Sequence, residues 1–117
     1  MPAAEPTIFE RIVAREIPAD VVYEDDRIIA FRDIAPKAAV HLLVVPKTAR
    51  FENVAQLAAG DPALLADVVA TADRLAGELS NGEYRLVFNS GPSAGQTVFH
   101  VHAHLLSGNL DESSLAD

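Results

Sequence analysis

The sequence of 117 residues contains no cysteine and no tryptophan, and its aromatic residues are only five phenylalanines and two tyrosines. Without cysteine, the chain can form neither a disulfide framework nor a thiolate zinc site. With so few aromatic rings, its core must consist mainly of valine, isoleucine, leucine and alanine. A chain of this length typically folds as one unit, and we expect a single domain over residues 1–117.

The sequence also lacks long apolar runs and an excess of positive charge. No run approaches the ~20 residues that a membrane-spanning helix needs, and the first residues lack the basic-then-apolar pattern of a secretion signal. We therefore predict no membrane partner and a cytoplasmic location. Nine lysines and arginines against seventeen aspartates and glutamates give a formal net charge of −8. Because such a chain repels polyphosphate backbones, nucleic acid is not an expected partner, and any phosphate must be held locally by amides, hydroxyls or histidines.

Two helices are predicted, one short and one long. The short helix follows Thr7, which has the spacing of a capping box with Glu10. The long helix covers 61–79, where apolar residues recur with helical period and where an aspartate and a proline suit the N-cap and the first helical position. Gly82 tolerates the left-handed backbone that ends such a helix.

Five apolar or β-branched runs are predicted to be strands, with short connections between most of them. These runs are 21–24, 28–31, 40–45, 84–89 and 98–106. Short connections with one long helix inserted are typical of an α+β fold with an antiparallel sheet, here of about five strands, rather than of a parallel, doubly wound sheet. From about residue 109 the chain is polar and acidic, and we expect a partly disordered tail there.

Three of the four histidines, His100, His102 and His104, alternate with apolar residues. On a strand, alternate side chains point to the same face, about 7 Å apart. The segment is therefore predicted to present a row of imidazoles on one face. Its other face is predicted to join the core through Phe99, Val101, Ala103 and Leu105.

This imidazole row has three interpretations. The histidines could be ordinary surface residues, or they could form a metal site with His41 as a fourth nitrogen ligand. In the third interpretation they carry out nucleophilic catalysis, in which one imidazole attacks and its neighbours orient it. No carboxylate lies within the strand, and we predict no metal and no cofactor. The preceding segment, 89–97, is rich in small residues and hydroxyls. Such a loop lets backbone amides approach an anion, which favours catalysis at a phosphate.

The segment from His100 to Leu106 resembles the motif of the histidine-triad family, His-x-His-x-His followed by apolar positions. The order and spacing of further segments, over roughly residues 8–108, resemble the Hint branch of that family. These segments are Ile8-Phe9, Glu16-Ile17-Pro18-Ala19, Tyr23-Glu24-Asp25-Asp26, Ala30-Phe31, Asp33-Ile34-Ala35-Pro36, His41 and Val45-Pro46-Lys47. The resemblance implies a purine nucleoside phosphoramidase that acts on AMP- or GMP-type substrates.

The resemblance also implies roles for individual residues. His102 would attack the α-phosphorus and form a nucleotidyl-histidine, and the main-chain carbonyl of His100 would fix its tautomer. His104 and His41 would complete the histidine network at the phosphate. Thr97 would supply a hydroxyl there, where the family usually has serine.

Further residues are implied to bind the substrate. The phosphate or the leaving group would contact Asn89, Gly95 and Gln96, and Asp33 would accept hydrogen bonds from the ribose hydroxyls. An apolar slot for the purine would be formed by Ile8, Phe9, Ile12, Ile17, Phe31, Ile34 and Leu43. The resemblance further implies a homodimer, with 61–79 and 84–89 at the interface.

Two features leave the substrate open. The Trp-Pro-Pro stretch that commonly ends Hint proteins is missing, so the leaving group is not specified. The loop 91–97 also resembles the fragile-histidine-triad branch, which cleaves dinucleoside polyphosphates. A nucleotide-binding regulator with incidental hydrolysis is a third alternative.

Overall fold

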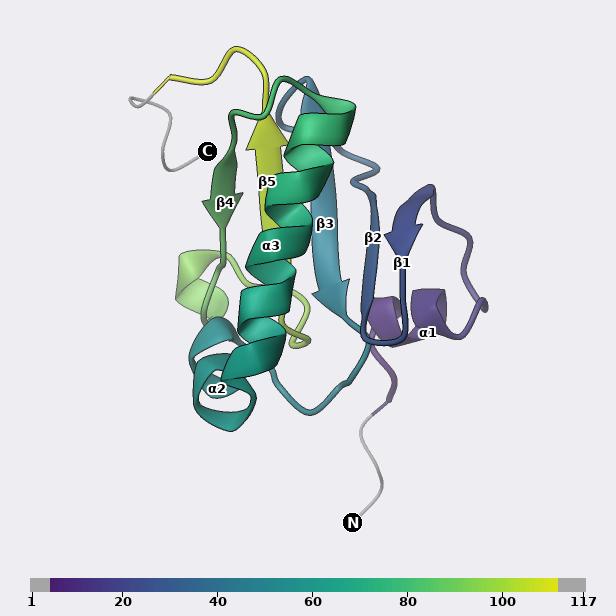
Figure 1. Ribbon diagram of the computed structural model, residues 1–117. Coiled ribbons are helices and arrows are strands. Elements are labelled where there is room, and N and C mark those ends of the chain that lie inside the picture. Colours follow the sequence, from purple (N-terminus) through teal and green to yellow (C-terminus); the bar gives the residue numbers. More distant parts are fainter. Residues whose placement is uncertain (1–4, 112–117) are drawn as a thin grey trace.

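A computed structural model describes residues 5–111 of the chain. Its centre is an antiparallel sheet with the strand order β1-β2-β3-β5-β4. The strands are β1 (Val21–Glu24), β2 (Ile28–Arg32), β3 (Val40–Pro46), β4 (Arg85–Val87) and β5 (Ala103–Ser107). This architecture confirms the predicted α+β fold with five strands (Figure 1). Among the described residues, no helix is long and apolar enough to span a membrane.

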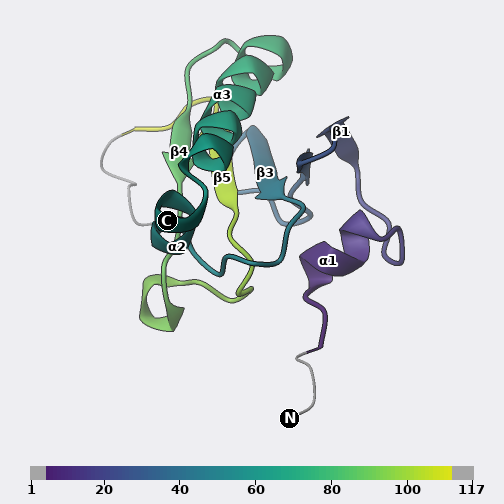
Figure 2. The ribbon, with the colours of Figure 1, turned by 60° about the horizontal axis from the view of Figure 1, so that its bottom comes forward.

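Helices lie on both faces of the sheet (Figure 2). On one face, α2 (Val54–Gly60) and α3 (Pro62–Leu79) bury alternate strand residues such as Leu42, Val44 and Leu105. On the other face, the six-residue α1 (Ile8–Val13) packs Phe9 and Ile12 against β2 and β3. Because α1 is so short, it leaves the β5-β4 side of this face uncovered.

The helix ends follow the sequence signals closely. At α1, the Thr7 hydroxyl accepts from the Glu10 amide, and the Glu10 side chain accepts from the Thr7 amide, so the predicted capping box is confirmed. At α3, the Asp61 side chain accepts from the Leu64 amide at 3.0 Å. After the C-terminal end of α3, Gly82 adopts the predicted left-handed backbone conformation, with a φ of +85°. The long helix is therefore confirmed over its predicted range.

The short helix α2 is missing from the sequence prediction. Its N-cap is Asn53, whose side chain accepts from the Gln56 amide at 2.9 Å. The Gln56 side chain in turn accepts from the Glu52 amide, also at 2.9 Å. The Asn-x-x-Gln spacing was the available signal for this helix.

The predicted strand 98–106 is too long at its start, because β5 begins only at Ala103. The preceding residues bond to other segments instead: the Val101 amide donates to the Phe51 carbonyl at 3.0 Å, and the His100 ring bonds to the Pro46 carbonyl. As a result Phe99 is 45% exposed, against the prediction, whereas Val101, Ala103 and Leu105 are buried as predicted.

The predicted strand 84–89 is also longer than the observed strand, because β4 covers only Arg85–Val87. Of the predicted tail, 112–117 lies outside the described residues.

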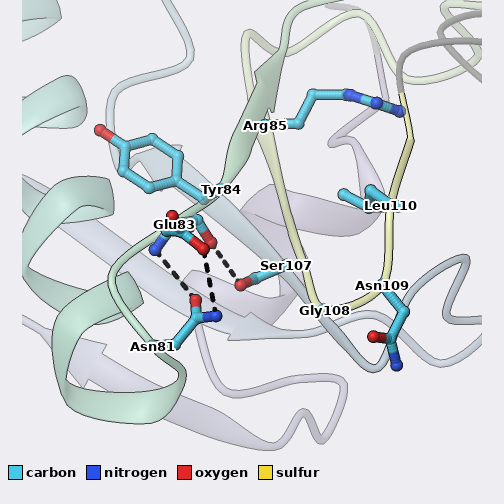
Figure 3. A pocket seen from close by; sticks show the side chains of 8 residues that line it. All are labelled: Asn81, Glu83, Tyr84, Arg85, Ser107, Gly108, Asn109 and Leu110. Atoms are coloured by element: carbon cyan, nitrogen blue, oxygen red, sulfur yellow. Dashed lines mark hydrogen bonds between the residues drawn. The ribbon is translucent and has the colours of Figure 1, made fainter.

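A polar cavity of about 240 Å³ lies where β5 ends, at the opposite end of that strand from His104 (Figure 3). Its buried Ser107 hydroxyl donates to the Glu83 carbonyl at 2.5 Å. Since this uses the only proton of Ser107, the bond of 2.7 Å between Ser80 and Ser107 must be donated by Ser80. These bonds tie the end of α3 to the end of β5.

Candidate active site

The histidines lie on the sheet face that α1 covers only in part. His41 on β3 and His104 on β5 point to this face, because cross-strand pairing sets His104 opposite the buried Leu43. The His102 ring packs edge-on against Phe9 of α1, with ring centroids 4.8 Å apart, and lies 5.0 Å from the His104 ring. Segments far apart in the sequence therefore bring all four histidines together.

The tautomer of His102 follows from its hydrogen bond. Nδ1 of His102 lies 2.8 Å from the main-chain carbonyl oxygen of His100. A carbonyl oxygen only accepts, so Nδ1 carries the proton and Nε2 keeps its lone pair. Burial lowers the pKa of His102 below its usual value, which favours the neutral ring. His102 is thus a neutral imidazole with a free nucleophilic nitrogen.

His100 supports His102 from inside the protein. Its side chain is fully buried, and its Nε2 lies 2.6 Å from the Pro46 carbonyl oxygen, to which it must donate. Burial lowers the pKa of His100 as well. The ring is therefore fixed in one tautomer, and its main-chain carbonyl is held beneath His102.

A second chain of hydrogen bonds sets the tautomers of His41 and His104. The Lys37 amide donates to Nδ1 of His41 at 3.0 Å, so the proton of a neutral His41 lies on Nε2. This Nε2 lies 3.0 Å from Nδ1 of His104, and donation there leaves the His104 proton on Nε2. Burial, with smaller contributions from His102 and His41, lowers the pKa of His104 to about 4. His104 therefore presents an N–H donor next to the lone pair of His102.

The same chain of bonds bears on the metal interpretation. Ligand atoms of Asp33, His41 and His104 lie within 4.8 Å of one another. Coordination through Nε2 of His41 would move its proton to Nδ1, which already receives the Lys37 amide proton. The cluster is therefore better suited to hydrogen bonding than to metal coordination, and the metal-free site stays our prediction.

The loop before the histidines is bent by two glycines and held by one buried side chain. Gly91 and Gly95 have φ values of +92° and +94° on either side of the short 3₁₀ turn Pro92–Ala94. Gln96 is only 4% exposed. Its amide nitrogen donates to the Glu52 and Val98 carbonyls at 2.6 and 3.1 Å, and its oxygen accepts from the Gly91 amide at 2.9 Å. Gln96 is thus the internal brace of this loop.

Replacing Gln96 with alanine is expected to lower the free energy of unfolding by about 2 kcal/mol, because three partly buried backbone groups lose their hydrogen-bond partner. Urea denaturation measures this change. The exposed Ser93 of the same loop provides the matched control, and Ser93→Ala should change stability by less than about 0.5 kcal/mol. Equal stability of the two variants would show that Gln96 does not hold the loop.

Most of the predicted site residues line one of two adjoining cavities. The larger, of about 550 Å³, is lined by Asp33, Lys37, His41, Asn89, Gly95 and His104, among others. The smaller, of about 150 Å³, is lined by all seven residues predicted for the purine slot, with Pro18, Ala19, Arg32 and Asp33. Asp33 borders both cavities, and Ile34 at the rim is 99% exposed.

Some residues of the site differ from the prediction or were missing from it. Thr97 lines a neighbouring hollow with Ile8 and Val98, rather than the cavity that contains His104. Lys37 was not predicted, although its amide fixes the His41 tautomer. The sequence offers no signal for this contact, because it depends on how the loop between β2 and β3 folds back.

Comparisons with known proteins agree with this fold. The chain is 50% identical over 107 residues to a HIT-like protein of Synechococcus elongatus, covering 90% of this chain and 92% of the relative. It is 40% identical over 107 residues to the purine nucleoside phosphoramidase of Escherichia coli K12, covering 90% and 89%. Among solved structures, a HIT family hydrolase from Clostridium thermocellum superposes with a TM-score of 0.84 at 41% identity, covering 94% and 96%. These relatives support an enzyme of the hydrolase class.

The histidine arrangement also agrees with a match to a family model. The model of the HIT domain matches residues 14–110, which include the whole sheet and all four histidines. The chain therefore belongs to the HIT family.

Proposed function

We propose that this protein hydrolyses purine nucleoside 5′-phosphoramidates at the α-phosphorus, with His102 as the nucleophile. The observation that carries the proposal is the bond of 2.8 Å from Nδ1 of His102 to the His100 carbonyl, which leaves Nε2 free to attack. The 40% identity to an enzyme named purine nucleoside phosphoramidase supports this choice of substrate.

In the first step, Nε2 of His102 attacks the phosphorus and the P–N bond of the substrate breaks. The leaving nitrogen keeps the electron pair of that bond and takes up one proton. His102 becomes positively charged, and its Nδ1–H bond to the His100 carbonyl stabilises that charge. The N–H of His104 is placed to donate to a phosphoryl oxygen, where negative charge develops.

In the second step, water attacks the phosphorus of the nucleotidyl-histidine. The bond from phosphorus to Nε2 breaks, the nucleoside monophosphate leaves with one proton released, and His102 returns to the neutral form. Both steps depend on positioning and on hydrogen bonds to the phosphoryl oxygens. The chain's own amides, hydroxyls and imidazoles can supply these bonds despite its net charge of −8.

The two cavities divide the substrate between them. We place the purine in the apolar slot and the ribose at Asp33, which borders both cavities. The phosphate then lies in the larger cavity, near Asn89, Gly95 and His104. Thr97 is close in sequence to this loop and could supply a hydroxyl from its neighbouring hollow.

The test is turnover of adenosine 5′-phosphoramidate by the purified protein, with and without EDTA. We expect multiple turnovers to AMP at equal rates in both, since no step uses a metal ion. Elemental analysis of the same preparation provides the control for bound metal. Loss of turnover with EDTA, restored by a divalent cation, would contradict the metal-free mechanism.

Cleavage of dinucleoside polyphosphates is a second candidate, because Lys37 lines the larger cavity and could attract an anionic leaving group. Diadenosine tetraphosphate, assayed beside the phosphoramidate, separates the two: the better substrate has the higher kcat/KM. If neither is turned over and AMP binds tightly, the protein is a nucleotide-binding regulator.

We also propose the homodimer and the cytoplasmic location that the sequence analysis predicts. The face of α3 that points away from the sheet carries Val69, which is 40% exposed in the single chain. Sedimentation equilibrium of the purified protein measures the oligomeric state directly.

A further inference from the structure

Thr7 lies between helix α1 and the histidines. Its hydroxyl oxygen is 3.5 Å from Nδ1 of His100, across 93 positions of sequence. The same oxygen accepts from the Glu10 amide at 3.2 Å as part of the capping box. The residue that starts α1 therefore also contacts the buried member of the triad.

The direction of this contact follows from the other bonds of the two residues. Nε2 of His100 donates to the Pro46 carbonyl, so in the neutral ring Nδ1 has only a lone pair and needs a donor. The Thr7 oxygen already accepts from an amide, and its own proton remains to be donated. Thr7 is therefore the donor and His100 the acceptor.

This bond favours one protonation state of His100. A donor to Nδ1 stabilises the neutral ring and opposes a second proton. Burial lowers the pKa of His100 in the same sense, whereas the bond to the Pro46 carbonyl and, to a smaller extent, the nearby Glu10 raise it. A charged His100 would lie next to the nucleophile, and its charge would lower the pKa of His102.

We propose that Thr7 is a positioning residue for the nucleophile: its hydroxyl holds the buried His100 ring in the neutral Nε2–H form, and the His100 carbonyl in turn orients His102. This inference rests on the function proposed above for His102. It adds a residue that the sequence analysis assigned only to helix capping.

Helix α1 also connects the purine slot to the histidines that support the nucleophile. Ile8 and Phe9, which line the slot, directly follow Thr7 on α1. The Phe9 ring packs edge-on against both His100 and His102, with centroids 5.9 and 4.8 Å away. A shift of α1 would thus disturb the slot and the support of His102 together.

Three substitutions separate capping from support of His100. Thr7→Ser keeps both the cap and the donor. Thr7→Asp keeps the cap, because aspartate is among the best N-cap residues, but its carboxylate cannot donate. Thr7→Val keeps the shape of the side chain and removes both functions.

For adenosine 5′-phosphoramidate we expect kcat of Thr7→Val and Thr7→Asp to fall about tenfold, the rate equivalent of one hydrogen bond. For Thr7→Asp, which keeps the cap and so the position of Ile8 and Phe9 in the purine slot, KM should change less than about twofold. Thr7→Ser should restore kcat to within about twofold of the wild type. Thermal unfolding confirms that each variant is folded at the assay temperature.

A second measurement does not depend on activity. The ¹⁵N resonance of His100 Nδ1 in the free protein should move to the position of an unbonded, unprotonated nitrogen in Thr7→Val. In Thr7→Asp it should move toward the position of a protonated nitrogen. If the wild type has no phosphoramidase activity, the proposed function fails and this measurement still tests the Thr7–His100 bond. An unchanged resonance in Thr7→Val, or wild-type kcat in folded Thr7→Val and Thr7→Asp, would overturn the proposal.

Discussion

Replacing His102 with alanine is expected to lower kcat for adenosine 5′-phosphoramidate by about 10⁴-fold or more, because no other described group presents a free lone pair at this position. His104 cannot take over this role. The chain of hydrogen bonds from Lys37 and His41 uses the lone pair on Nδ1 of His104 and leaves the proton of His104 on Nε2. Binding of AMP should remain within about tenfold, since the purine slot and Asp33 are unchanged. Steady-state kinetics and calorimetric titration with AMP measure the two effects.

A companion variant, His102→Gly, distinguishes loss of the nucleophile from damage to the fold. The smaller side chain leaves space for free imidazole, which should restore part of the turnover in proportion to its concentration. In the wild type, quenching during turnover with denaturant at alkaline pH, where the P–N bond of a phosphorylated histidine is stable, should trap a nucleotide on His102, detectable by mass spectrometry. Full turnover by purified His102→Ala would exclude His102 as the nucleophile.

The stability of the protein is expected to fall as the pH is lowered from about 6.5 to about 4. In the unfolded chain, histidine titrates near 6.5, whereas burial lowers the pKa of folded His104 to about 4. Between these values the unfolded state binds more protons, so the free energy of unfolding decreases with decreasing pH. Above about 6.5 both states are neutral and the contribution is constant; below about 4 it levels off. For His104 alone the full change is on the order of 3 kcal/mol.

The measurement is urea denaturation at several pH values for the wild type and for His104→Gln, which does not titrate. We expect a shallower dependence on pH in the variant, and the difference between the two curves isolates His104. Carboxylates also contribute at low pH, such as Glu24, whose pKa is lowered chiefly by Lys47, and Asp25, whose pKa is lowered chiefly by Tyr23. These groups are present in both proteins and cancel. Parallel curves would mean that His104 is not held neutral by the fold.

Several elements of the fold could be predicted because their signals are local. The capping box of α1 spans four residues, Thr7 to Glu10. The start of α3 depends on Asp61 and on the proline that follows it. The hairpin of β1 and β2 depends on two β-branched runs around one polar turn. In each case the residues that decide the structure lie within a few positions of one another.

The prediction failed where distant segments compete for the same backbone. The alternation of residues 98–106 suits a strand throughout, yet its first half bonds to the Phe51 and Pro46 carbonyls instead of to the sheet. Phe99 is exposed for this reason. No pattern within residues 98–106 indicates that the first half of the segment bonds to these other carbonyls.

The sequence by itself determined the α+β class, the ends of the main helices, the spacing of the triad and the resemblance to the histidine-triad family. That resemblance also implied His102 as the expected nucleophile. Only the tertiary structure decided the proton positions of His100, His41 and His104. The tautomer of His100 depends on Pro46, and that of His104 on His41 and the Lys37 amide, which lie more than 50 positions away. Side-chain periodicity is a local property of the chain, whereas a tautomer is set by whichever donors and acceptors the fold brings within hydrogen-bonding distance.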